Sequence, residues 1–191
     1  TTIYTKYSKT DWKNGSMFAG NYNKRFPKYD RGTARALVRV PYWYDGLINL
    51  QTSQINSVKL DLSDLYPGNP PNTISVYKMN EYWDDLSAVC SDKLWDGYDK
   101  TALTTRVFKW GNRDYVDDNG VHHYLVDITK AVKDWKDGKT TDNGLMLKAE
   151  DESIAARVFG TVDGNYPLNL EVSYGYKVKI NESDSQLTVG D

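Results

Sequence analysis

The chain contains a single cysteine, Cys90, in 191 residues, so it cannot form an internal disulfide. It also lacks an excess of positive charge, because 24 basic residues are offset by 26 acidic residues. This balance argues against the basic stripe of a nucleic-acid-binding protein. No apolar run approaches the length of a membrane span, and the sequence opens on Thr1 without a signal peptide. We therefore expect an excised domain with neither a nucleic-acid partner nor a membrane partner.

Familiar catalytic motifs are also missing from the sequence. It has no nucleophile elbow, no phosphate-binding loop and no HExxH motif. Paired carboxylates such as Asp84-Asp85 could serve a glycosidase, and arginine, histidine and tyrosine could serve a polysaccharide lyase, yet no spacing singles out such a set. We predict a protein without catalytic residues or a cofactor, with a lyase or hydrolase as the least favoured alternative.

Aromatic residues, in contrast, are plentiful and of a particular kind. The chain has 15 tyrosines and 6 tryptophans but only 4 phenylalanines. Tyrosine and tryptophan combine an apolar body with a polar tip, so they suit half-exposed positions. Strands also favour them. The surplus indicates a binding surface without specifying it.

Alternation with a period of two dominates the sequence, which is typical of strands with one buried face. Glycine, proline and asparagine punctuate these runs at turns. We predict an all-β fold, an antiparallel β-sandwich of jelly-roll type, as one domain over residues 1–176, followed by a polar tail or linker over 177–191. The alternating runs are 34–40, 58–62, 74–76, 124–126, 145–147, 154–158 and 168–176.

One segment follows a helical period instead. Ile128, Ala131, Val132 and Trp135 have the i, i+3, i+4, i+7 spacing of one helix face. Asp127 is a suitable N-cap and Gly138 a suitable C-terminal stop, so the spacing predicts one short helix over 128–136. Trp135 is expected in the core, and so is Trp83.

Several motifs occur together in a preserved order and resemble the DNRLRE-type domain family of bacterial and archaeal surface proteins and polysaccharide-degrading enzymes. The namesake string is absent, and the similarity is weakest over residues 86–120. The motifs are Arg35–Val40, Ile55–Leu62, Val76–Lys78 with Trp83-Asp84, Val126–Val132 with Trp135, Gly138 and Asn143–Lys148, and Pro167–Tyr174.

The resemblance implies a secreted or cell-surface β-sandwich within a larger protein. Some members of the family are carbohydrate-binding modules. We therefore predict a monomeric, extracellular module that binds a plant, algal or microbial polysaccharide and targets an attached enzyme or cell surface. A structural or adhesive spacer that binds no sugar is the alternative, since fold similarity alone does not assign function.

The run Tyr42-Trp43-Tyr44 is the first candidate ligand site. Three successive large aromatics cannot all face a core, because neighbours on a strand point to opposite sides. An exposed ring could stack on the apolar face of a sugar, and Asp45 and Asn49 could bind its hydroxyls. Burial of one or two of these rings is the equally favoured alternative.

A second candidate group, Trp95, Tyr98, Trp110 and Tyr115, lies in the divergent region, where Gly97 and Gly111 indicate loops. Basic residues are interspersed with these aromatics and suit carboxylates, so an acidic glycan is one ligand to consider. Aromatics tucked beneath a solvated loop are the alternative. The basic residues are Lys93, Arg106, Lys109 and Arg113.

The remaining polar features are interpreted structurally. His122 and His123 are adjacent and would face opposite sides of a strand, so we expect structural or solvated roles rather than a shared metal. Residues 117–120, Asp-Asp-Asn-Gly, predict a turn. A structural calcium loop is the less favoured alternative, because the spaced oxygen ligands of an EF-hand are missing.

Overall fold

The computed structural model describes residues 1–6, 15–39, 47–83, 92–161, 166 and 168–175. Within this part of the chain, eleven strands pair exclusively antiparallel to one another. The strands are β1 (Thr2–Tyr4), β2 (Ser16–Asn21), β3 (Thr33–Val38), β4 (Ile55–Asp64), β5 (Asn72–Lys78), β6 (Thr104–Phe108), β7 (Tyr115–Val116), β8 (His122–Asp127), β9 (Leu145–Ala149), β10 (Arg157–Gly160) and β11 (Asn169–Tyr174). The helical segments are α1 (Tyr22–Arg25), α2 (Asp92–Trp95), α3 (Thr129–Lys136) and the 3-10 turns η1 (Leu47–Asn49), η2 (Thr52–Gln54) and η3 (Trp110–Asn112).

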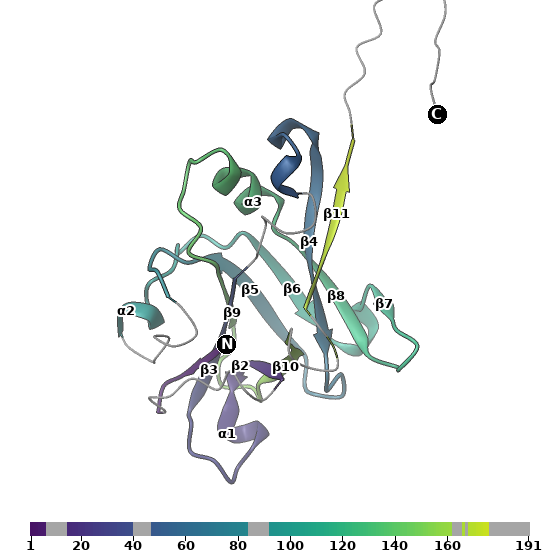
Figure 1. Cartoon of the computed structure of the whole chain (residues 1–191). Coiled ribbons are helices and arrows are strands. Elements are labelled where there is room, and N and C mark those ends of the chain that lie inside the picture. The colour runs from purple at the N-terminus through teal and green to yellow at the C-terminus, as the bar shows by residue number, and fades with distance from the viewer. Residues whose placement is uncertain (7–14, 40–46, 84–91, 162–165, 167, 176–191) are drawn as a thin grey trace, which may run out of the picture.

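The strands form one continuous sheet that curls back on itself. Their order is β6-β5-β9-β3-β2-β10-β4-β8-β7, with β1 added beside β3 and β11 beside β4. Strand β2 pairs with β3 near its end and with β10 along its first residues. It therefore joins the layer that runs from β6 to β3 with the layer that runs from β10 to β7. In Figure 1 the strands β11, β4 and β8 run side by side. This arrangement confirms the predicted antiparallel all-β sandwich with a short accessory helix.

The core lies between the two layers and follows the alternation of the sequence. On β4, Val58, Leu60 and Leu62 are buried, whereas Lys59 and Asp61 point to the opposite face. Aromatic rings link the layers: Phe108 of β6 lies 4.2 Å from Tyr124 of β8, centroid to centroid. Burying each such side chain stabilises the fold by about 1.5–3 kcal/mol.

Helix α3 closes one end of this core. Ile128, Ala131, Val132 and Trp135 are all buried, as their spacing predicted. The helix ends at Lys136, and Gly138, just after the C-cap Asp137, has a φ of 67°, the left-handed conformation that favours glycine.

The predicted N-cap of α3 is displaced by one residue. Ile128 occupies that position, and Asp127 instead accepts the amide N–H of Thr129 through Oδ1 at 2.8 Å. The hydroxyl of Thr129 accepts the amide N–H of Val58 at 2.8 Å, so the first residue of the helix is tied to β4.

A smaller hydrophobic cluster covers the outer face of β3, β9 and β5. It contains Ile3, Leu37, Met79, Trp83, Leu94 and Met146. Trp83 is only 2% exposed, which confirms its predicted place in a core. Among the described helices, none is both long enough and apolar enough to span a membrane.

Candidate functional site

Five of the nine predicted ligand-binding residues lie in the described part of the chain, where they occupy three different places. Tyr42, Trp43, Tyr44 and Asp45 lie outside the described residues. Asn49 is exposed at the end of η1, which Lys136 ties to the end of α3 by donating to the carbonyl of Leu47 at 2.7 Å. The other four aromatics divide into two pairs, Trp95 with Tyr98 and Trp110 with Tyr115.

Trp95 and Tyr98 are half-buried against the outer face of β3 and β5. The guanidinium of Arg35 covers the indole of Trp95, 3.8 Å from its ring centroid, and donates to the Trp95 carbonyl at 2.7 Å. The ring of Tyr98 packs against Tyr77 of β5 with 4.8 Å between centroids. These contacts leave less aromatic surface for a ligand here than at the second pair.

Trp110 and Tyr115 are exposed at the edge of the sandwich where β7 pairs with β8. Their exposed fractions are 61% and 42%. Each ring contacts one of the two histidines that begin β8: Trp110 meets His122 and Tyr115 meets His123, both at 4.4 Å between centroids. The structure therefore brings together two predicted ligand residues with two histidines for which a structural or solvated role was predicted.

The ring of Tyr115 is held in place by contacts at one face and at its hydroxyl group. It lies parallel to the His123 imidazole, with 10° between the planes, and its hydroxyl donates to Oδ2 of Asp61. Burial and the hydrogen bond to this carboxylate raise the pKa of the Tyr115 hydroxyl well above its ordinary value. Nδ1 of His123 lies 2.9 Å from the other carboxylate oxygen of Asp61. One face of the Tyr115 ring thus rests on protein, while 42% of the residue remains exposed.

The indole of Trp110 lies near a positive charge, whereas Tyr115 lies near a carboxylate. His122 meets the ring at 60°, and the guanidinium carbon of Arg113 lies 5.8 Å from the ring centroid. Arg113 also donates to the carbonyl of Trp110. Burial, assisted by the positive charge of Arg113, lowers the pKa of His122 and so favours the neutral form of this imidazole.

The segment that carries both aromatic rings is anchored to the neighbouring strands. Nη2 of Arg106 on β6 donates to the Asn112 carbonyl at 2.7 Å and to the carboxylate of Asp114 at 2.8 Å. Asp114 in turn accepts the amide N–H of Leu125 at 2.7 Å. The hydroxyl of Tyr124 donates to the carbonyl of Lys109 at 2.8 Å. The segment from Trp110 on η3 to Tyr115 on β7 is therefore held in place by hydrogen bonds to β6 and β8.

Three of the four basic residues predicted to accompany the aromatics lie close to Trp110 and Tyr115, and one lies elsewhere. Arg106 and Arg113 belong to the anchoring network of this loop, and Lys109 is exposed beside Trp110. Lys93 lies apart from them and forms an ion pair with Glu81 at 2.8 Å.

The predicted turn at 117–120 connects β7 to β8. Oδ1 of Asp117 accepts the amide N–H groups of Asn119 at 3.0 Å and Val121 at 2.8 Å. These bonds lower the pKa of Asp117 and commit one of its carboxylate oxygens to the turn. No cluster of three or more histidine, cysteine, aspartate or glutamate side chains suited to a metal ion occurs among the described residues.

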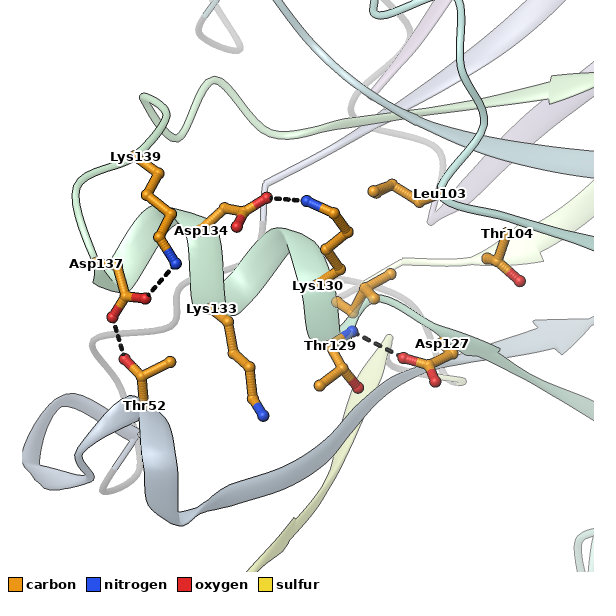
Figure 2. A pocket seen from close by; sticks show the side chains of 11 residues that line it. Thr52, Leu103, Thr104, Asp127, Thr129, Lys130, Lys133, Asp134, Asp137 and Lys139 are labelled. Carbon is orange, nitrogen blue, oxygen red and sulfur yellow. Dashed lines mark hydrogen bonds and ion pairs between the residues drawn. The ribbon is translucent and has the colours of Figure 1, made fainter.

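A pocket of about 610 Å³ lies beside α3, between η2 and the start of β6 (Figure 2). Four of its charged side chains pair with one another: Lys130 contacts Asp134 at 2.5 Å, and Asp137 contacts Lys139 at 2.8 Å. Asp137 also accepts the hydroxyl of Thr52 at 2.5 Å. Its described lining includes no aromatic ring on which a sugar could stack, so the edge at β7 and β8 is the stronger candidate site.

Comparison with models of known protein families gives no match, and no curated protein matches the sequence either. The resemblance to the DNRLRE-type family therefore stays a prediction.

Proposed function

We propose that this chain is a non-catalytic carbohydrate-binding module in which Trp110 and Tyr115 stack on the sugar rings of a polysaccharide. The observation that carries the proposal is their joint exposure at one edge of the sandwich, each ring backed by a histidine. The apolar C–H face of a pyranose matches the π-face of such rings. Sites of this kind combine apolar surface with a few placed polar groups, here Arg113 and Lys109.

The support given to Tyr115 favours binding over a purely structural role. A side chain that is already held in place loses little conformational entropy when a ligand covers it. The stack on His123 and the hydrogen bond to Asp61 supply that fixation. A spacer module would gain nothing from holding a tyrosine rigid while 42% of it faces solvent.

The same contacts favour binding over lyase chemistry. Tyr115 and His123 both hydrogen-bond to Asp61, and Nε2 of His123 is buried. A catalytic base must reach the proton that it abstracts within hydrogen-bonding distance. The buried imidazole of His123 offers no such base to a substrate on the surface.

We further propose that the module acts outside the cell and holds an attached enzyme or cell surface near its polysaccharide. The aromatic surplus and the resemblance of its motifs to the DNRLRE-type family support this setting. The spacer module without sugar binding remains the alternative function, and binding measurements separate the two.

Affinity electrophoresis of the whole chain against β-glucan, xylan, mannan, pectin and alginate tests the proposal. We expect retardation on at least one polysaccharide, and we expect Trp110→Ala and Tyr115→Ala each to weaken it by about 1–3 kcal/mol, the range of an aromatic hot spot. Tyr29→Ala is the matched control, because Tyr29 is 53% exposed but lies between α1 and β3. Retardation on none of the five, or equal losses in all three variants, would overturn the proposed site.

A further inference from the structure

The two adjacent histidines of β8 have opposite electrostatic surroundings. His122 faces Trp110 and lies near the cation of Arg113. His123 lies between two carboxylates: Nδ1 is 2.9 Å from Oδ1 of Asp61, and Nε2 is 3.7 Å from Oδ2 of Asp117. Burial and the charge of Arg113 lower the pKa of His122, whereas the two charged groups nearest the ring nitrogens of His123 are carboxylates.

The second ring nitrogen of His123 is buried and makes no hydrogen bond within the described part of the chain. A neutral imidazole has one N–H, and the short contact to Asp61 uses it. The lone pair of Nε2 then faces the carboxylate of Asp117. A second proton would convert this unsatisfied contact into a charge-assisted one.

Two other ionisable groups around His123 keep the same protonation state near neutral pH. Tyr115 of β7 has a raised pKa and stays a phenol, and Asp117 of the turn has a lowered pKa and stays a carboxylate. Beyond Asp61 on β4, the ion pair of Lys59 with Glu171 of β11 spans 3.0 Å. Histidine ordinarily gains its proton between about pH 8 and pH 5.

We propose that His123 is a positioning residue whose protonation clamps Tyr115 in its exposed orientation. The imidazolium would gain a contact with Asp117, which belongs to the turn that follows Tyr115. It would also place a cation beneath the face of the Tyr115 ring, and cations are attracted to that face. Both effects hold the hairpin of β7 and β8 more tightly at low pH. Binding through Tyr115, which rests on the proposed function, should then be about two- to fivefold tighter at pH 5 than at pH 8.

Nuclear magnetic resonance of the ligand-free chain tests the clamp without any sugar. We expect the ring signals of Tyr115 to shift between pH 8 and pH 5 with the same midpoint as those of His123. His123→Gln, which keeps a side chain able to bond Asp61, should abolish the shift of Tyr115, and Asp117→Asn should reduce it. Signals of Tyr115 that ignore pH in the wild-type chain, or that shift equally in His123→Gln, would overturn the inference.

Affinity electrophoresis on neutral β-glucan, xylan and mannan at pH 5 and pH 8 extends the test to binding. If the wild-type chain binds, we expect the pH dependence to disappear in His123→Gln, and an unchanged dependence would contradict the clamp. If Tyr115 shifts with His123 and the chain binds no polysaccharide, the clamp stands and the proposed function fails. The two ideas can thus fail separately.

Discussion

Arg157 and Asp64 form an ion pair that is completely shielded from solvent, with 2.8 Å between Nη1 and Oδ2. The second terminal nitrogen of Arg157 donates to the backbone carbonyls of Asn69, Pro70 and Phe108 at 3.1, 2.9 and 2.6 Å. A single guanidinium therefore fastens β10 to β4, to the turn after β4 and to the end of β6. The arginine thus satisfies four acceptors, one of them a fully buried carboxylate.

Replacing this arginine by an apolar side chain should be costly. Arg157→Met leaves the Asp64 carboxylate buried without its partner, which costs about 3–5 kcal/mol of the free energy of unfolding. Urea denaturation measures the loss. Lys59→Met is the control, because its ion pair with Glu171 is exposed and is worth about 0–1 kcal/mol. Equal losses in the two variants would show that burial does not determine how much an ion pair contributes to the free energy of unfolding.

Two glycines with similar backbone conformations should respond differently to a methyl group. Gly144 and Gly120 have φ angles of 82° and 78°. A Cβ on Gly144 would lie 2.6 Å from the carbonyl oxygen of Val38, whereas a Cβ on Gly120 would meet nothing within 4 Å. Gly120→Ala should cost about 1–2 kcal/mol for the left-handed conformation alone. Gly144→Ala should cost clearly more in the same denaturation experiment, and equal costs would contradict the steric argument.

Features of the fold that depend on local spacing could be predicted from the sequence. The alternation of Val58, Leu60 and Leu62 identified a half-buried strand, and the spacing from Ile128 to Trp135 identified the helix. Both patterns reflect the period of a single element, which neighbouring residues reveal. The short helices α1 and α2 were not predicted, since four residues are too few for a periodic pattern.

The site was only partly predictable because its partners come from distant strands. Trp110 and Tyr115 were candidates, but Asp61 was not, since it reaches His123 only through the pairing of β4 with β8. That register depends on the whole sheet. A local signal for His123 did exist: the predicted turn at 117–120 places Tyr115 and His123 at equal distances from Asn119, and they pair across the hairpin. No such signal shows that Arg35 covers Trp95, sixty residues away.

The stability of the chain should fall at alkaline pH through two tyrosines, Tyr115 and Tyr124, whose hydroxyls are hydrogen-bonded within the protein. Burial raises the pKa of the Tyr115 and Tyr124 hydroxyls, with Asp61 and Asp64 as the nearest negative charges. Tyrosine in the unfolded chain loses its proton at about pH 10, while these two tyrosines in the folded chain still hold theirs. Above that pH, deprotonation therefore lowers the free energy of the unfolded state relative to the folded state. The stabilisation is complete below pH ~10 and is lost as the pH rises toward the folded values.

Urea denaturation at pH 7 and in steps above pH 10 measures this loss. Tyr124→Phe should lower stability at pH 7, because the hydroxyl that donates to the Lys109 carbonyl is gone, and should flatten the decline above pH 10. Tyr29→Phe is the control, as Tyr29 is largely exposed. A decline as steep in Tyr124→Phe as in the wild-type chain would show that this hydroxyl does not contribute.

Two tryptophans should separate folding from binding. Trp135 is 5% exposed on the inner face of α3, and Trp110 is 61% exposed on η3. Trp135→Ala removes a large buried ring and leaves a cavity, so it should cost about 3–5 kcal/mol of stability. Trp110→Ala removes mostly solvated surface, so its effect on unfolding should stay within about 1 kcal/mol, the usual range for surface changes.

The binding phenotype of this pair should be reversed. Any polysaccharide that retards the wild-type chain should retard Trp135→Ala equally under conditions in which that variant is still folded, as circular dichroism can verify. It should retard Trp110→Ala less, because the ring that stacks on the sugar is missing. If Trp110→Ala unfolds the chain while Trp135→Ala alone loses the sugar, the assignment of one ring to the core and the other to the ligand is inverted. The exposure of Trp110 would then reflect loop packing rather than a binding surface.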